Sequence, residues 1–134
     1  MEDKEIIIDH ALGICVNIYN TNKPLVLNNN CRKRNTVKAK RMFLYFLKNV
    51  MDVKHAHMTD YFVKMNHATS IHHVNKFSFE VQHYSEIKND YDFFTKEINS
   101  FKIYGENYRA KMRMINQINK LMQEINLIEN DKGI

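Results

Sequence analysis

Residues that interrupt helices are scarce in this sequence. One proline and three glycines occur among 134 residues, well below the usual share of both residue types. Tight β-hairpins depend on glycine, asparagine or proline at defined turn positions. The sequence therefore argues against a sheet built from many hairpins and predicts an all-α fold.

Cysteine and long apolar runs are also scarce. The two cysteines, Cys15 and Cys31, are too few for a disulfide framework, so we expect reduced thiols, as is usual in a cytoplasmic protein. No apolar run approaches the roughly 20 residues of a membrane span. The charged start, Glu2 to Glu5, differs from a secretory signal. We expect a cytoplasmic protein without a membrane partner, and the abundance of Asn, Ile and Lys fits the AT-rich genome of a phage or mobile element.

Motifs of catalysis and cofactor binding are absent. The sequence has no G-x-x-x-x-G-K-[ST], G-x-S-x-G, H-E-x-x-H or C-x-x-C, which are the signatures of phosphate binding, acyl transfer and metal chemistry. The pair His55 and His57 lacks the further ligands that zinc requires. We therefore expect no enzyme, no cofactor, no metal and no small-molecule substrate.

Apolar residues recur at helical spacing along most of the chain. The pattern predicts helices over residues 3–19 and 36–51, with Thr36 as the N-cap of the second. The helical pattern continues over residues 79–103 and is expected to end at Gly105. Its apolar stripe is Val81, Tyr84, Ile87, Tyr91, Phe94, Ile98 and Phe101. Residues 106–130 form an amphipathic pattern. We expect a helical domain, residues 1–104, and a C-terminal helix, residues 105–134, which either folds back or pairs with a second copy through residues 106–130.

Positive charge is concentrated in the middle of the chain. Between Asn28 and Lys76 there are ten Lys and Arg residues and two acids, whereas the whole chain has a net charge of +5. The same stretch contains a short predicted helix, residues 57–64, a tight connection and a third helix that opens at His67. Two helices joined in this way are the layout of a helix-turn-helix, and the charge indicates a polyanionic partner.

The run from Met65 to Phe77 resembles the signature of the C-terminal DNA-binding domain of the bacterial replication initiator DnaA, roughly R-D-H-T-T-V-x-H-A-x-x-K-I. His67, Thr69, His72 and Lys76 match it identically. The resemblance covers about residues 5–80 and is specific over residues 58–77. Val63 and Lys64 stand where the family has turn glycines, and Met65 stands where it has arginine. The initiator's nucleotide-binding module has no counterpart.

The resemblance implies an all-α helix-turn-helix domain of the DnaA C-terminal or Trp-repressor-like type, with double-stranded DNA as its partner. The basic loop, which ends with Arg32, Lys33 and Arg34, would contact phosphates or the minor groove, and the helix that opens at His67 would read bases. The DNA-binding residues expected on this basis are Arg32, Lys33, Arg34, Lys38, Lys40, Asn66, His67, Ala68, Thr69, Ser70, His72, His73 and Lys76.

Two functions are compatible with these features. The first is a sequence-specific double-stranded DNA-binding protein that regulates replication or transcription. The second is a structural or interaction protein of a phage or mobile element, in which the helical fold persists and residues 106–130 bind a partner. The exposed basic surface and the position of the C-terminal helix would discriminate between them.

Overall fold

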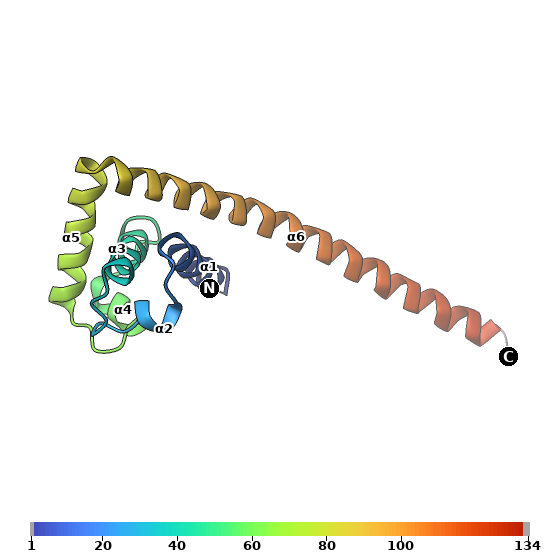
Figure 1. Ribbon diagram of the computed structural model, residues 1–134. Helices are drawn as coiled ribbons and strands as arrows, with labels where there is room; N and C mark the ends of the chain where they lie inside the picture. Colours follow the sequence, from blue (N-terminus) through green and yellow to red (C-terminus); the bar gives the residue numbers. More distant parts are fainter. Residues whose placement is uncertain (1, 133–134) are drawn as a thin grey trace. The chain divides into compact units, whose positions relative to one another are not determined.

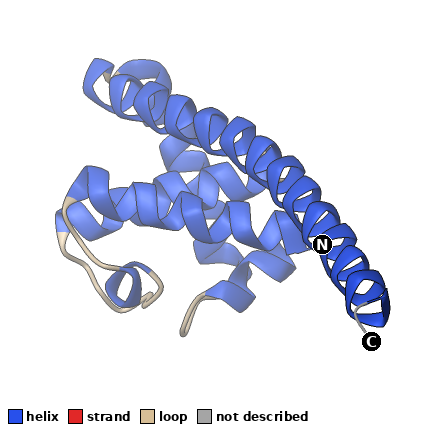
Figure 2. Cartoon of the chain, turned by 90° about the vertical axis from the view of Figure 1, so that its right-hand side faces the viewer, coloured by secondary structure: helices blue, strands red, loops and turns tan. Residues whose placement is uncertain are grey.

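The computed structural model describes the backbone of residues 2–132 and the side chains of residues 4–102 and 110–127. It is all-helical over these residues, which confirms the predicted all-α class (Figures 1 and 2). The chain divides into two units, Met1–Asn99 and Ser100–Ile134. The elements are α1 (Glu2–Tyr19), α2 (Lys23–Val26), α3 (Arg34–Asn49), α4 (His55–Met58), a 3-10 helix η1 (Thr59–Tyr61), α5 (His67–His83) and α6 (Ser85–Lys132).

Helix α3 is the centre of the first unit. It lies between α1 and α5 in Figure 1, and these two helices make its most extensive contacts. Successive aromatic residues of α3 reach different neighbours: Phe43 lies 6.0 Å from Phe62, and Phe46 lies 5.2 Å from Phe94, between ring centroids. Because such a helix is apolar on most sides, it contributes a large share of the buried apolar residues of the core.

The start of α5 agrees with the prediction, whereas the start of α3 does not. Asn66 is the N-cap of α5, and its Oδ1 accepts a hydrogen bond from the Thr69 backbone N–H at 2.9 Å. Helix α3 begins at Arg34, two residues before the predicted Thr36 cap. Thr36 is instead fully buried, and its hydroxyl shares a hydrogen bond of 2.7 Å with that of Thr21. The hydroxyl serves the packing of two segments, so it does not cap the helix.

The predicted helix break at Gly105 is wrong, because α6 runs through this residue. The break lies at Tyr84, whose backbone is extended. Tyr84 N–H donates to Glu80 O at 2.9 Å, and Lys88 N–H donates to Tyr84 O at 3.0 Å, so one residue ends α5 and begins α6. A lone glycine costs a helix only about 1 kcal/mol relative to alanine, and the apolar pattern continues across both positions.

The first part of α6 belongs to the core of the first unit. Ile87, Phe94 and Ile98 are buried as the apolar stripe predicts, and Tyr19 OH donates to Asp90 Oδ2 at 2.9 Å. Tyr84, expected in the same stripe, is exposed instead. None of the helices in the described part of the chain combines the length and apolarity that crossing a membrane requires.

Two adjacent phenylalanines test this packing. Phe94 is 1% exposed and Phe93 is 54% exposed. We expect Phe94→Ala to lower the free energy of unfolding by about 3–5 kcal/mol, because it leaves a cavity in the core. The matched control, Phe93→Ala, should change it by less than about 0.5 kcal/mol. Urea unfolding followed by circular dichroism measures both, and similar losses in the two variants would contradict the assignment of residues 85–99 to the core.

Candidate nucleic-acid interface

Two adjoining hollows follow the surface between α3 and α5. The larger has a volume of about 810 Å³, and five cationic side chains and two glutamates are among its lining residues. The smaller has about 420 Å³ and extends to the first turns of α5. Arg32, Val37 and Arg41 line both. We call the combined surface the basic groove; its cationic side chains and N-terminal α5 residues are Arg32, Arg34, Lys38, Arg41, Lys76, Thr69, His72 and His73.

Lys40 supports the groove from inside. The residue is 1% exposed, and its Nζ donates to the backbone oxygens of Asn28 and Cys31 at 3.0 and 3.3 Å. Burial lowers the pKa of this ammonium group, and the charge of Arg32 adds to the effect. A buried ammonium requires hydrogen-bond acceptors, which the loop carbonyls supply. Lys40, one of the predicted DNA-binding residues, is thus buried, and its side chain holds the loop that carries Arg32.

A backbone ladder fastens the same loop to the segment that precedes α5. Val63 N–H donates to Leu27 O at 2.7 Å, and Asn29 N–H donates to Val63 O at 3.1 Å. Lys64 follows in a left-handed conformation, with φ of 63°. This position coincides with one of the family's turn glycines, so a non-glycine residue occupies it here at some conformational cost. These two backbone hydrogen bonds bring the basic loop close to the N-terminus of α5.

Ser70, another of the predicted DNA-binding residues, is fully buried. Its Oγ lies 2.9 Å from His55 Nδ1 in a hydrogen bond that joins the starts of α4 and α5. Burial lowers the pKa of His55, and the nearby charges of Lys48 and His67 lower it further. Because a neutral imidazole keeps one acceptor and one donor nitrogen, it suits this partly buried hydroxyl.

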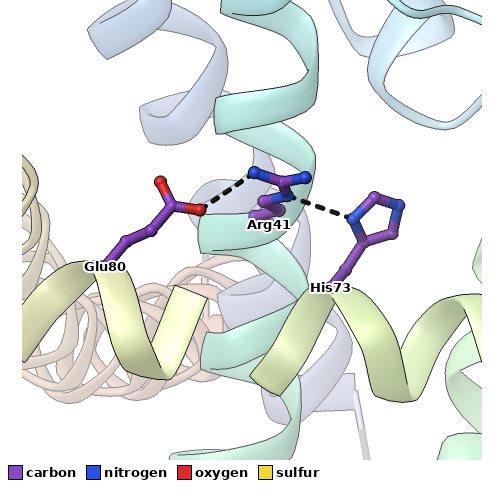
Figure 3. A network of polar contacts seen from close by, with 3 residues as sticks. All are labelled: Arg41, His73 and Glu80. Atoms are coloured by element: carbon purple, nitrogen blue, oxygen red, sulfur yellow. Dashed lines mark hydrogen bonds and ion pairs between the residues drawn. The ribbon is translucent and has the colours of Figure 1, made fainter. Parts of the chain in front are cut away.

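Arg41 forms a network with two residues of α5, as Figure 3 shows. Its Nη1 donates to Glu80 Oε1 at 2.9 Å, and its Nε donates to His73 Nδ1 at 3.3 Å. Burial, followed by the charge of Arg41, lowers the pKa of His73 to about 4. His73 is therefore neutral near pH 7 and adds no charge to the groove. The network fixes α5 against α3 beneath the groove.

Arg41 was missing from the predicted interface, although the sequence contains a signal for it. Arg34, Lys38 and Arg41 are spaced by four and three residues, which places them on one side of a helix. The contact with Glu80 depends on the packing of two helices and has no such signal. The aromatic residues beside the larger hollow were also missed: Phe79 and Tyr84 are exposed, and the rings of Phe79 and His83 stack at 4.1 Å.

The remaining predicted residues differ in where they lie. Arg32, Arg34, His72 and Lys76 are exposed along the groove, and Lys38 and Thr69 are half-buried there. The other exposed residues are not part of its lining: Lys33, Asn66, His67 and Ala68. Asn66 has a structural role as the cap of α5. Within the described part of the chain, no three His, Cys, Asp or Glu side chains are grouped closely enough to hold a metal ion.

The low pKa of His73 predicts a pH-dependent stability. The ordinary pKa of histidine is about 6.5, so between pH 6.5 and 4 the unfolded chain binds more protons at this site than the folded one. The free energy of unfolding should therefore fall as the pH falls through this window. His73→Gln keeps an acceptor for Arg41 and does not titrate, so its pH slope should be shallower. Urea unfolding at several pH values measures it, and identical slopes in both proteins would contradict the prediction.

The comparisons with known proteins do not identify the chain. No protein-family model matches it, and neither does a curated protein or a solved structure.

Proposed function

We propose that this chain binds double-stranded DNA through the basic groove and the N-terminal turns of α5, as a regulator of replication or transcription. The observation that carries the proposal is the concentration of cationic side chains around one hollow beside an exposed helix start. Five Lys or Arg residues and two Glu residues are among the residues that line the larger hollow. One of the glutamates, Glu80, is already paired with Arg41, so most of the positive charge is available to phosphates.

The first turn of α5 is suited to approach a base edge. His67 and Ala68 are exposed and Thr69 is half-buried, so the side chains at this end are short or able to form hydrogen bonds. Asn66 caps the turn and fixes its geometry. An α-helix fits the major groove, which is about 12 Å wide. Thr69 can offer a hydroxyl to a base and a methyl group to thymine.

The positions of the residues that match the DnaA signature also support an approach of α5 to DNA. His67, His72 and Lys76 of the matched set are exposed on α5. Thr69 and His72 line the smaller hollow together with Arg32 from the basic loop. In the proposed complex, α5 supplies base contacts, while Arg32 and Arg34 contact phosphates on one side of it. Phosphate contacts position a protein on DNA, and base contacts make it specific.

Single-stranded nucleic acid is a second candidate ligand, favoured by the exposed aromatic residues. Phe79 and Tyr84 are about half exposed, and Tyr84 lines the larger hollow beside Lys76. Aromatic side chains next to a basic channel are typical of sites that stack unpaired bases. Titration of a duplex and a single strand of the same length at equal salt separates the candidates, since tighter binding of the single strand would favour the second.

Arg34 tests the electrostatic part of the proposal. Arg34→Ala should weaken binding to all duplexes and reduce the slope of log K against log salt by about one, because one phosphate contact is lost. Lys4→Ala is the matched control: it removes one positive charge from an exposed residue of α1, which packs on α3 and is separated from α5 by it (Figure 1). Fluorescence anisotropy at four salt concentrations measures the slopes, and equal slopes in the two variants would place Arg34 away from DNA.

Thr69 tests whether α5 reads bases. A preferred duplex is first selected from random sequences. Thr69→Ala should then lose about 1–3 kcal/mol of binding free energy on that duplex, the usual size of one good base contact. Binding to a random duplex at the same salt should change little, because phosphate contacts supply that term. Equal losses on both duplexes would show a backbone contact only, and no loss on either would mean that α5 does not enter the groove.

A further inference from the structure

An exposed apolar face runs along the second half of α6. Met114, Ile115, Ile118, Leu121, Met122 and Ile125 have exposed fractions between 37% and 62%. Their spacing of three and four residues places all six on one side of the helix. A contiguous apolar face on an exposed helix usually marks an interaction surface.

The spacing indicates which kind of partner fits this face. Ile115 and Met122 occupy one core position of successive heptads, and Ile118 and Ile125 occupy the other. Met114 and Leu121 extend the apolar face on one side. The face is therefore wider than the stripe of a coiled coil that uses only the two core positions. The matching partner is another helix with the same repeat and the same broad face. A second copy of α6 meets this requirement without further assumptions, since isologous pairing needs only one self-complementary surface.

Charge along the helix distinguishes the two possible orientations. In the sequence, residues 109–120 contain four Lys or Arg and no acid, whereas residues 121–131 contain three acids and no Lys or Arg. Lys111 lies one heptad before Ile118, and Glu129 lies one heptad after Met122, so the two residues continue the core positions at opposite ends of the apolar run. A parallel pair would bring like charges together at both ends, and an antiparallel pair brings opposite charges together.

We propose that two copies of this chain associate through an antiparallel pairing of their α6 segments over residues 111–129. The apolar face of each helix is buried against that of the other, with Ile118 of one copy opposite Met122 of its partner. Leu121 lies near the two-fold axis, and Lys111 lies opposite the partner's Glu129. The proposal goes beyond DNA binding and does not depend on it, since it uses none of the groove residues.

A pair of glutamate substitutions in the full-length chain tests the interface. Ile118 lies at the centre of the apolar face, and Leu127 lies half a turn away from it around the helix and is 65% exposed. Ile118→Glu should raise the dimer dissociation constant by more than about 100-fold, because it buries two unpaired carboxylates in the interface. Leu127→Glu should change it by less than about threefold. Sedimentation velocity over a range of concentrations measures both, and circular dichroism confirms that both variants are folded.

Three outcomes would overturn the pairing. A wild-type chain that stays monomeric up to about 100 µM would mean that the face is covered within one chain or by a different protein. Equal effects of Ile118→Glu and Leu127→Glu would show that the face is not the interface. A larger effect of Leu127→Glu would place the contact on the opposite side of the helix.

Charge reversal tests the orientation. In the antiparallel pair, Lys111→Glu and Glu129→Lys should each weaken association, by about fivefold at low salt, because each dimer contains two such contacts. The double variant should recover wild-type association, because opposite charges meet again. In a parallel pair each single reversal only exchanges one like-charge contact for another, so unchanged association in both single variants would overturn the antiparallel arrangement.

Discussion

Burial of α3 between α1 and α5 is the constraint on which the candidate interface depends. The helix carries core residues such as Phe43 and Phe46 on its buried sides, and it carries Arg34, Lys38 and Arg41 where it borders the groove. The same backbone thus fixes the core and positions the charges. Because close-packed interiors resist displacement, the cationic side chains keep a defined relation to α5, which an electrostatic interface on a loose surface would lack.

Buried and half-buried polar groups complete this arrangement. Lys40 holds the basic loop, Ser70 joins α5 to α4, and the contact between Arg41 and Glu80 fastens α5 to α3. A single broken member of such a set leaves a buried group without a partner, which costs more than the intact bond contributes. The main effect of these contacts is therefore to fix one arrangement of the helices and the loop, and their net contribution to the free energy of folding is smaller. Lys40, Arg41 and Ser70 come from the segment, residues 28–76, whose charge indicated a polyanionic partner.

The sequence predicted the helices well because hydrophobic periodicity reports directly on the buried side of a helix. It placed the start of α5 correctly because Asn66 and the short polar residues after it are a strong capping signal. It failed where a polar residue is used inside the protein, as for Thr36, Lys40 and Ser70. Their partners come from other segments of the chain, and spacing within one helix contains no information about them. The break at Tyr84 was missed for a related reason, since the apolar repeat does not change there.

The two proposals, taken together, constrain the DNA that this protein would recognise. Two copies paired through α6 carry two basic grooves, so a duplex bound by both copies needs two half-sites. Binding of the first groove raises the effective concentration of the second, which increases the overall affinity without any new contact. Loss of pairing would then remove only this gain and leave each groove's preference for a half-site intact. Loss of a groove residue would change binding to a single half-site as well, so half-site and full-site duplexes separate the contributions of α6 and of α5.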